Sequence, residues 1–129
     1  MSVRAFMAKA ERSLASAILL LANGDPDGAC SRGYYAMFDA ARAALQANAE
    51  TVEAGMSKTH SGVINAFGQY LVNSGKVSVE CGKTFNKAHQ LRLVADYKGD
   101  PVEHDAAARM IEHAKLFVAE IQIVLKSSI

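Results

Sequence analysis

The stretch that decides the fold is Ser31-Arg32-Gly33-Tyr34-Tyr35-Ala36-Met37-Phe38-Asp39-Ala40-Ala41-Arg42-Ala43-Ala44-Leu45. Apolar side chains recur in and just before it at steps of three and four, the spacing that places residues on one face of an α-helix. These positions are Cys30, Tyr34, Phe38, Ala41 and Leu45. Because this face carries two aromatic rings, we expect it to form the thickest part of a hydrophobic core.

A polar flank lies beside this apolar face. Its members are Arg32, Tyr35, Asp39 and Arg42. We expect the flank to be solvated. Asp39 and Arg42 are three residues apart, and such a pair stabilises a helix by about 0.2–0.5 kcal/mol.

The chain has 129 residues, of which 14 are basic and 13 acidic, so its net charge is +1. This length favours one domain, residues 1–129, with its own core. The near-neutral net charge creates no overall electrostatic attraction to nucleic acid or membrane, and a local charged patch is the remaining alternative. We find neither a membrane-spanning apolar run nor a signal-peptide layout, and we expect a cytoplasmic protein. The two cysteines, Cys30 and Cys81, are expected to be buried thiols in a reducing compartment.

Apolar periodicity predicts helices over residues 3–22, 25–48, 57–72, 78–95 and 102–126, with the segment 50–56 as a loop. The expected N-caps are Ser2, Asp25, Ser57 and Ser78. The chain shows no alternating strand pattern and no Asn-Gly hairpin turn. The sequence therefore predicts an all-α, antiparallel up-down bundle of four to five helices. The last helix has a wide apolar face, which either a homodimer or the monomer core could bury.

The sharpest polar cluster is predicted on the fourth helix. His89, Arg92 and Asp96 fall within about 60° of one another and of an apolar neighbour, Phe85. Two interpretations are open. Arg92 and Asp96 form an ordinary surface ion pair flanked by His89, or Arg92 binds a phosphate, oriented by the acid and next to a titrating imidazole. Tyr97 would point about 140° away from Arg92 on an unbroken helix.

A second candidate is Lys58-Thr59-His60-Ser61-Gly62, which opens the third predicted helix. Free amides at a helix start, together with Lys58, could hold an anion, and ordinary capping is the alternative. His104 and His113 are expected at the surface. The four histidines lack metal-ligand spacing, and no P-loop, nucleophile elbow or dinucleotide motif occurs. We therefore expect no metal and no cofactor.

Three segments in this order, 31–38, 58–64 and 91–97, resemble the HEPN domain, in particular its small stand-alone bacterial and archaeal branch. The resemblance extends from about Arg4 to Val118. It implies an all-α bundle that usually dimerises. It also implies a frequent partner, a small nucleotidyltransferase encoded next door, with the pair acting as toxin and antitoxin.

Many HEPN proteins resemble metal-independent ribonucleases, whose signature is an Arg followed after four to six residues by a His. The two copies face each other across the dimer, and the RNA 2′-hydroxyl is the nucleophile. Arg92 matches the arginine, but the histidine window covers Tyr97, Lys98 and Gly99. The resemblance therefore makes Arg92 an RNA or anion contact, and it makes Asp96 and Tyr97 positioning candidates.

These three residues are the candidate catalytic set, and the candidate ligand-binding residues are Arg32, Lys58, His60 and His89. In some related pairs the partner transfers AMP to a tyrosine near the motif, which makes Tyr97 the candidate acceptor.

Three functional hypotheses follow. The first is a HEPN toxin that binds RNA or nucleotides at a dimer cleft and has weak endoribonuclease activity. The second is a non-catalytic module that binds a nucleotide or docks the nucleotidyltransferase. The third is a helical scaffold without a ligand, in which the Arg92 face is covered by protein.

Overall fold

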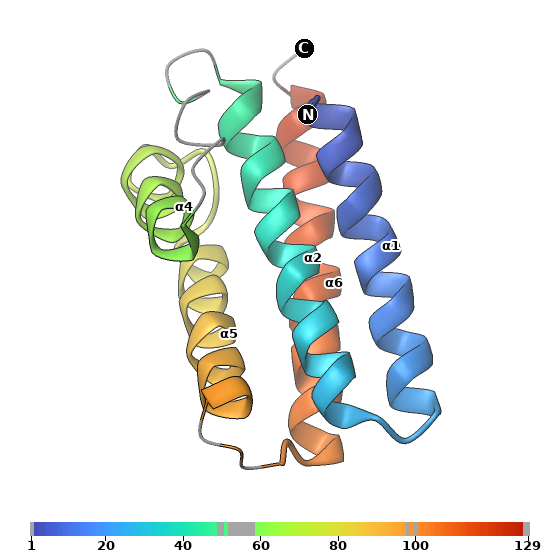
Figure 1. The fold of residues 1–129 in the computed structure, drawn as a ribbon. Helices are drawn as coiled ribbons and strands as arrows, with labels where there is room; N and C mark the ends of the chain where they lie inside the picture. The colour runs from blue at the N-terminus through green and yellow to red at the C-terminus, as the bar shows by residue number, and fades with distance from the viewer. Residues whose placement is uncertain (1, 49–50, 52–58, 98, 100, 128–129) are drawn as a thin grey trace.

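The computed structural model describes residues 2–48, 51, 59–97, 99 and 101–127, and for Tyr97 the backbone alone. Within this part of the chain the structure forms five α-helices and one π-helical segment, with no strand. Helices α1 (Val3–Ala22), α2 (Pro26–Ala47), α5 (Val79–Tyr97) and α6 (His104–Ser127) run in alternating directions (Figure 1). The short α4 (His60–Ala66) and the π-helical η1 (Phe67–Val72) pack against α2 at one end of the bundle. The predicted all-α up-down bundle is confirmed.

Helix α2 is the centre of the core, as its sequence predicts. Cys30, Tyr34, Ala41 and Leu45 are 0% exposed, and Phe38 is 7% exposed. The helix contacts α1, α4, α5 and α6, so it needs apolar side chains around most of its circumference. Both cysteines are buried and free. Burial raises the pKa of Cys30 to about 11 and that of Cys81 to about 12, which keeps both thiols protonated.

Local capping signals place the first two helices within a residue of their predicted bounds. The Ser2 hydroxyl accepts a hydrogen bond from the amide of Ala5 at 3.0 Å. The Asp25 carboxylate accepts one from the amide of Gly28 at 2.9 Å, and Pro26 occupies the first helical position. These side chains satisfy amides that have no partner inside the helix.

The third predicted helix needs two corrections. Its expected cap, Ser57, lies outside the described residues. The helix starts at His60, and Thr59 is the cap, whose hydroxyl accepts from Gly62 N–H at 3.1 Å. The second half, η1, is a π-helix with a wider turn, which changes the side that each residue presents. The apolar spacing of the sequence predicts Tyr70 on the buried face together with Phe67 and Leu71, but Tyr70 is 44% exposed.

The last helix begins at His104, two residues later than predicted. The amide of Val102 donates a hydrogen bond to the Asp27 carboxylate at 2.7 Å, and the Val102 side chain is 8% exposed. This contact fixes the chain against the start of α2 before α6 begins. The preceding helix, α5, ends two residues later than predicted, at Tyr97 rather than at residue 95.

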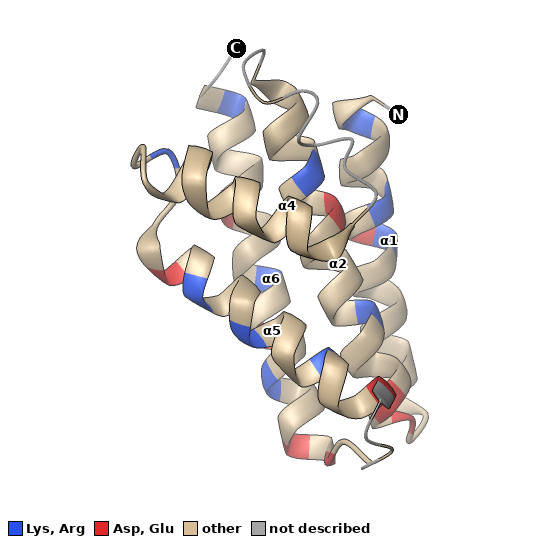
Figure 2. Ribbon diagram, turned by 60° about the vertical axis from the view of Figure 1, so that its left-hand side comes forward, with Lys and Arg blue, Asp and Glu red and all other residues tan. Residues whose placement is uncertain are grey.

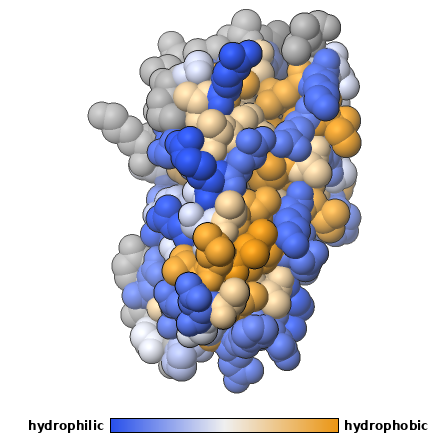
Figure 3. Space-filling view, turned by 90° about the vertical axis from the view of Figure 1, so that its right-hand side faces the viewer, coloured by the Kyte–Doolittle hydropathy of each residue, from blue (hydrophilic) through white to orange (hydrophobic). Residues whose placement is uncertain are grey.

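The monomer core buries most of the wide apolar face of α6, and two further apolar side chains of this helix, outside that face, stay exposed. Ile111 and Val118 are 4% and 3% exposed, so the monomer core buries much of it. Leu116 and Ile123 remain 71% and 65% exposed. On the face seen in Figure 3, hydrophobic side chains gather among hydrophilic ones. The homodimer stays a prediction, and no helix in the described part is apolar and long enough to span a membrane.

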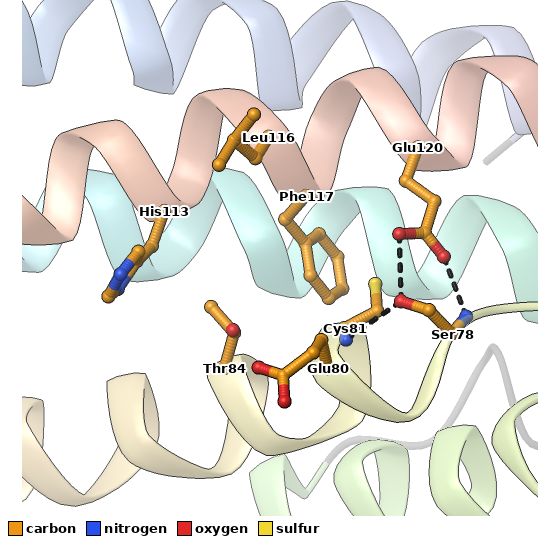
Figure 4. A pocket seen from close by; sticks show the side chains of 8 residues that line it. All are labelled: Ser78, Glu80, Cys81, Thr84, His113, Leu116, Phe117 and Glu120. Atoms are coloured by element: carbon orange, nitrogen blue, oxygen red, sulfur yellow. Dashed lines mark hydrogen bonds between the residues drawn. The ribbon is translucent and has the colours of Figure 1, made fainter.

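The start of α5 is capped by its predicted residue, Ser78, and by a carboxylate from α6 (Figure 4). Glu120 accepts hydrogen bonds from the Ser78 amide at 2.7 Å and from its hydroxyl at 2.9 Å. The Ser78 hydroxyl in turn accepts from the amide of Cys81 at 3.0 Å. A cavity of about 410 Å³ lies beside these residues, between α5 and α6. The cap therefore ties the start of α5 to a residue of α6 that lies 42 positions further along the chain.

We predict that Gly33→Ala destabilises the protein relative to Gly68→Ala. A Cβ at residue 33 would lie 2.9 Å from Met110 Cγ, whereas one at residue 68 would meet nothing within 4 Å. Alanine in a helix gains about 0.5–1 kcal/mol over glycine, and overpacking at residue 33 costs about 1–3 kcal/mol. Urea denaturation of both variants measures the difference. Equal stabilities would contradict the close α2–α6 approach.

We also predict that Glu120→Ala lowers the free energy of unfolding by about 1 kcal/mol, because two hydrogen bonds at the start of α5 are lost. Glu112→Ala on the same helix is the control. Glu112 makes only an exposed ion pair with Lys115, with Nζ and Oε1 3.1 Å apart, and its loss costs about 0.3–0.5 kcal/mol. Thermal denaturation compares the two variants, and an equal effect would refute the capping role of Glu120.

Candidate functional site

A buried tyrosine stands at the centre of the candidate site. Tyr34 is 0% exposed. Its ring lies 5.4 Å from that of Tyr35 and 6.1 Å from that of Phe38 on the same helix, and 6.2 Å from Phe85 of α5. A phenol hydroxyl buried in such surroundings needs a hydrogen-bond partner.

His60, the first residue of α4, supplies that partner. Its Nδ1 lies 2.7 Å from the Tyr34 hydroxyl, and its ring centroid lies 4.5 Å from that of Phe38. The His60 ring also stacks on His89 of α5, at 6.0 Å between centroids and 15° between planes. Two histidines from different helices thus meet beside Tyr34.

Burial keeps both histidines neutral near pH 7. It lowers the pKa of His60, and Arg92, His89 and Arg42 lower it further by repelling a positive imidazolium. Burial and Arg92 lower the pKa of His89 in the same way. His89 Nδ1 is buried and has no hydrogen-bond partner in the described part of the chain. Burial raises the pKa of Tyr34, so its hydroxyl stays protonated.

Arg92 lies mostly inward, with 13% of its side chain exposed. Its Nε is 3.0 Å from Oδ2 of Asp96, but the N–H is not aligned for a hydrogen bond, so the attraction is mainly Coulombic. The guanidinium also lies over two rings, 5.4 Å from the Tyr34 centroid and 5.3 Å from that of Tyr35. The predicted ion pair is present, and cation–π contacts hold Arg92 against the aromatic cluster.

A cleft of about 430 Å³ opens next to this cluster, between α1, α2 and the start of α4. Lys9, Arg32 and Arg42 bring positive charge to its lining, and Tyr35 is part of its wall. Figure 2 shows basic positions of α1 and α2 close to α4. The Arg32 guanidinium lies 5.3 Å from the Tyr35 centroid, so this ring contacts both the cleft and Arg92.

The prediction that the polar flank of α2 is solvated is wrong for Asp39. Its side chain lines the cleft, yet the residue is only 5% exposed. Burial raises the pKa of Asp39, while Lys9, Arg42 and Arg32 lower it by attraction. The carboxylate therefore sits within the field of three cations. Arg42 packs beside it over the ring of Phe6, 4.5 Å from the centroid.

The structure thus brings together five of the seven predicted site residues. Arg92, Asp96, His89, His60 and Arg32 lie around the tyrosine pair. The other two cannot be placed, since Lys58 and the Tyr97 side chain fall outside the described residues. Lys9, Ser13 and Arg42 line the cleft but were not predicted as site residues. His104 and His113 are exposed, as expected, and the described residues contain no cluster suited to a metal ion.

Comparison with known proteins supports one family. The sequence pattern of the HEPN domain matches residues 3–124. A Methanocaldococcus jannaschii protein named "Putative toxin MJ0605" is 35% identical over 124 residues, covering 96% of this chain and 89% of the relative. A Gloeobacter violaceus protein named "UPF0332 protein glr0978" is 41% identical over 93 residues, or 72% and 70% of the two chains.

A further Methanocaldococcus jannaschii protein, "Putative toxin MJ0142", is 31% identical over 85% of this chain and 72% of its own length. The family pattern, over residues 3–124, takes in all the helices from α1 to most of α6. The chain belongs to the HEPN domain family.

Proposed function

We propose that this chain is a toxin-like HEPN protein that binds RNA or nucleotides at the surface around Tyr34 and Tyr35. The observation that carries the proposal is the convergence of Arg92, His60 and His89 on the Tyr34 ring, at 5.4, 5.6 and 5.6 Å. The Arg92 cation suits a phosphate, and the partly exposed rings of Tyr35 and His60 beside it suit bases. Two relatives whose printed names include "toxin" support the biological role.

The same residues could support metal-independent RNA cleavage. In that reaction the 2′-oxygen attacks the adjacent phosphorus and forms a 2′,3′-cyclic phosphate, while the bond to the 5′-oxygen breaks. A base takes the proton from the 2′-hydroxyl, and an acid gives one to the departing 5′-oxygen. Arg92 would stabilise the charge on the phosphoryl oxygens. Asp96 would position Arg92.

The sequence signature lacks its histidine after Arg92, but His60 and His89 lie near Arg92 in space. Both imidazoles are neutral near pH 7 because their pKa values are lowered. A neutral imidazole can accept a proton, which is the first requirement of a general base. Weak endoribonuclease activity is therefore part of the proposal.

Two partners complete the proposal. A small nucleotidyltransferase would act as the antitoxin, with Tyr97 as the candidate acceptor of a transferred AMP. A second copy of this chain would place two Arg92 residues near a two-fold axis. The exposed Leu116 and Ile123 of α6 offer apolar surface for one of these contacts.

A non-catalytic binding module is the second candidate function. The partial burial of Arg92 favours it, since a guanidinium that is 13% exposed and paired with Asp96 is poorly placed to reach a scissile phosphate. In this case the surface would bind a nucleotide or the partner without breaking a bond.

We predict that Arg92→Ala weakens RNA binding about tenfold, which is about 1.4 kcal/mol, and abolishes any cleavage in EDTA. The matched control is Arg109→Ala, an exposed arginine on α6 that lies outside the site. Fluorescence anisotropy and gel analysis of a labelled oligoribonucleotide measure both effects, and circular dichroism checks that the variants fold.

Cleavage that is lost only with Arg92 supports the toxin ribonuclease. Binding without cleavage by wild type supports the binding module. RNA binding that is equal in wild type, Arg92→Ala and Arg109→Ala would refute both.

We predict that RNA binding strengthens as the pH falls from about 7.5 to about 5.5. The lowered pKa values of His60 and His89 mean that both rings gain their positive charge only on acidification below the usual value of 6.5. Each new charge near a phosphate adds about one unit to the salt dependence of binding. The double variant His60→Gln, His89→Gln should lose most of this pH dependence. A pH profile unchanged in that variant would contradict the placement of RNA at the histidine pair.

A further inference from the structure

The cleft beside the tyrosine pair concentrates positive charge in a near-neutral chain. Lys9 from α1 and Arg32 and Arg42 from α2 contribute three positive charges to its lining, and Asp39 contributes one negative charge. The described residues that line the cleft therefore carry a charge of +2 when Asp39 is ionised, while the whole chain carries +1. Such segregation creates a local field for anions.

The buried carboxylate holds these cations in place. Asp39 is 5% exposed, and Lys9, Arg42 and Arg32 all act on its charge. Among the described residues that line the cleft, the three basic side chains outnumber this one carboxylate, so the lining is net positive and suits an anion. Ser13, 8% exposed, adds a hydroxyl from α1 that can donate a hydrogen bond.

The remaining walls of the cleft are aromatic. The rings of Tyr35, Phe38 and His60 belong to its lining. Phe38 is only 7% exposed and packs with its ring centroid 4.5 Å from that of His60, so Tyr35 and His60 present the accessible rings. Flat rings of this kind stack on nucleobases without regard to sequence. The volume of about 430 Å³ falls within the range of small-ligand sites.

We propose that this cleft is a subsite for a nucleoside monophosphate group, with the phosphate at Lys9, Arg32 and Arg42 and the base against the partly exposed Tyr35 and His60 rings. This subsite specifies the ligand of the proposed function. It rests on that function only for the assumption that RNA or nucleotides are the natural ligands. A phosphate monoester, which carries up to two negative charges, matches the charge of the cleft better than an internal diester with one. The ligand is thus a free mononucleotide or the phosphorylated end of an RNA strand.

Histidine NMR tests this subsite directly. Full-length protein is titrated with 5′-AMP, inorganic phosphate and adenosine, and the ring protons of His60 are followed over pH. A bound phosphate should raise the pKa of His60, because a neighbouring negative charge favours the protonated ring. His104 and His113 are exposed on α6 and should not respond. We expect 5′-AMP to bind more tightly than phosphate, and adenosine to bind weakest.

Lys9→Ala is the informative variant, because Lys9 is exposed and its loss leaves the core intact. It should weaken 5′-AMP binding about fivefold or more. Lys83→Ala, an exposed lysine on α5, is the matched control and should bind like wild type. Oligoribonucleotides with a 5′-phosphate or a 5′-hydroxyl separate the two sources of ligand. A site for strand ends binds the 5′-phosphorylated strand more tightly, whereas a site for free mononucleotides binds the two strands alike.

The outcomes separate this inference from the proposed function. If 5′-AMP shifts His60 and Lys9→Ala weakens the effect, the subsite stands even where no longer RNA binds. If RNA binding depends on Arg92 but neither 5′-AMP nor phosphate affects His60, the subsite is refuted and the proposed function survives. Equal binding by Lys9→Ala and Lys83→Ala would also overturn it.

Discussion

The hydrogen bond between the buried phenol of Tyr34 and His60 is the constraint on which the candidate site depends. Tyr34 is fully buried, and its hydroxyl lies 2.7 Å from His60 Nδ1. Without that partner the burial of the hydroxyl would cost about 1–3 kcal/mol. The bond therefore fixes the start of α4 against α2. It also brings His60 within 6.0 Å of His89, so one satisfied hydroxyl organises side chains from three helices.

Most of the fold could be predicted because its signals are local. The apolar repeat of residues 30–45 and the caps at Ser2, Asp25 and Ser78 act within a few residues of themselves. The errors occur where distant contacts decide. The Val102 amide is bonded to Asp27, 75 residues away in sequence, and this delays the start of α6. The π-helical turn of η1 has no comparable local signal in its sequence, and the predicted burial of Tyr70 was wrong for that reason.

The same division holds for the candidate site, in which contacts within one helix could be predicted and contacts between helices could not. His89, Arg92 and Asp96 were correctly grouped because a single helix determines their relative positions, and Arg92 and Asp96 do form an ion pair. The approach of His60 to Tyr34 and the contribution of Lys9 to the cleft depend on packing between helices. Asp39 shows the limit most clearly. A charged residue on a predicted polar flank is 5% exposed, since α1 covers it and supplies a lysine that attracts its charge.

The distribution of charge, rather than its total, determines what this bundle can bind. A net charge of +1 predicts no general attraction to nucleic acid. The fold nevertheless places Lys9, Arg32 and Arg42 at one cleft, and Arg92 contacts Tyr35, a ring of the cleft wall. Aromatic rings contact Arg32, Arg42 and Arg92, and this cation–π attraction offsets part of the repulsion among the three guanidinium groups. The aromatic core of α2 thus serves two purposes. It stabilises the bundle, and at its edge it holds cations near one another against their mutual repulsion.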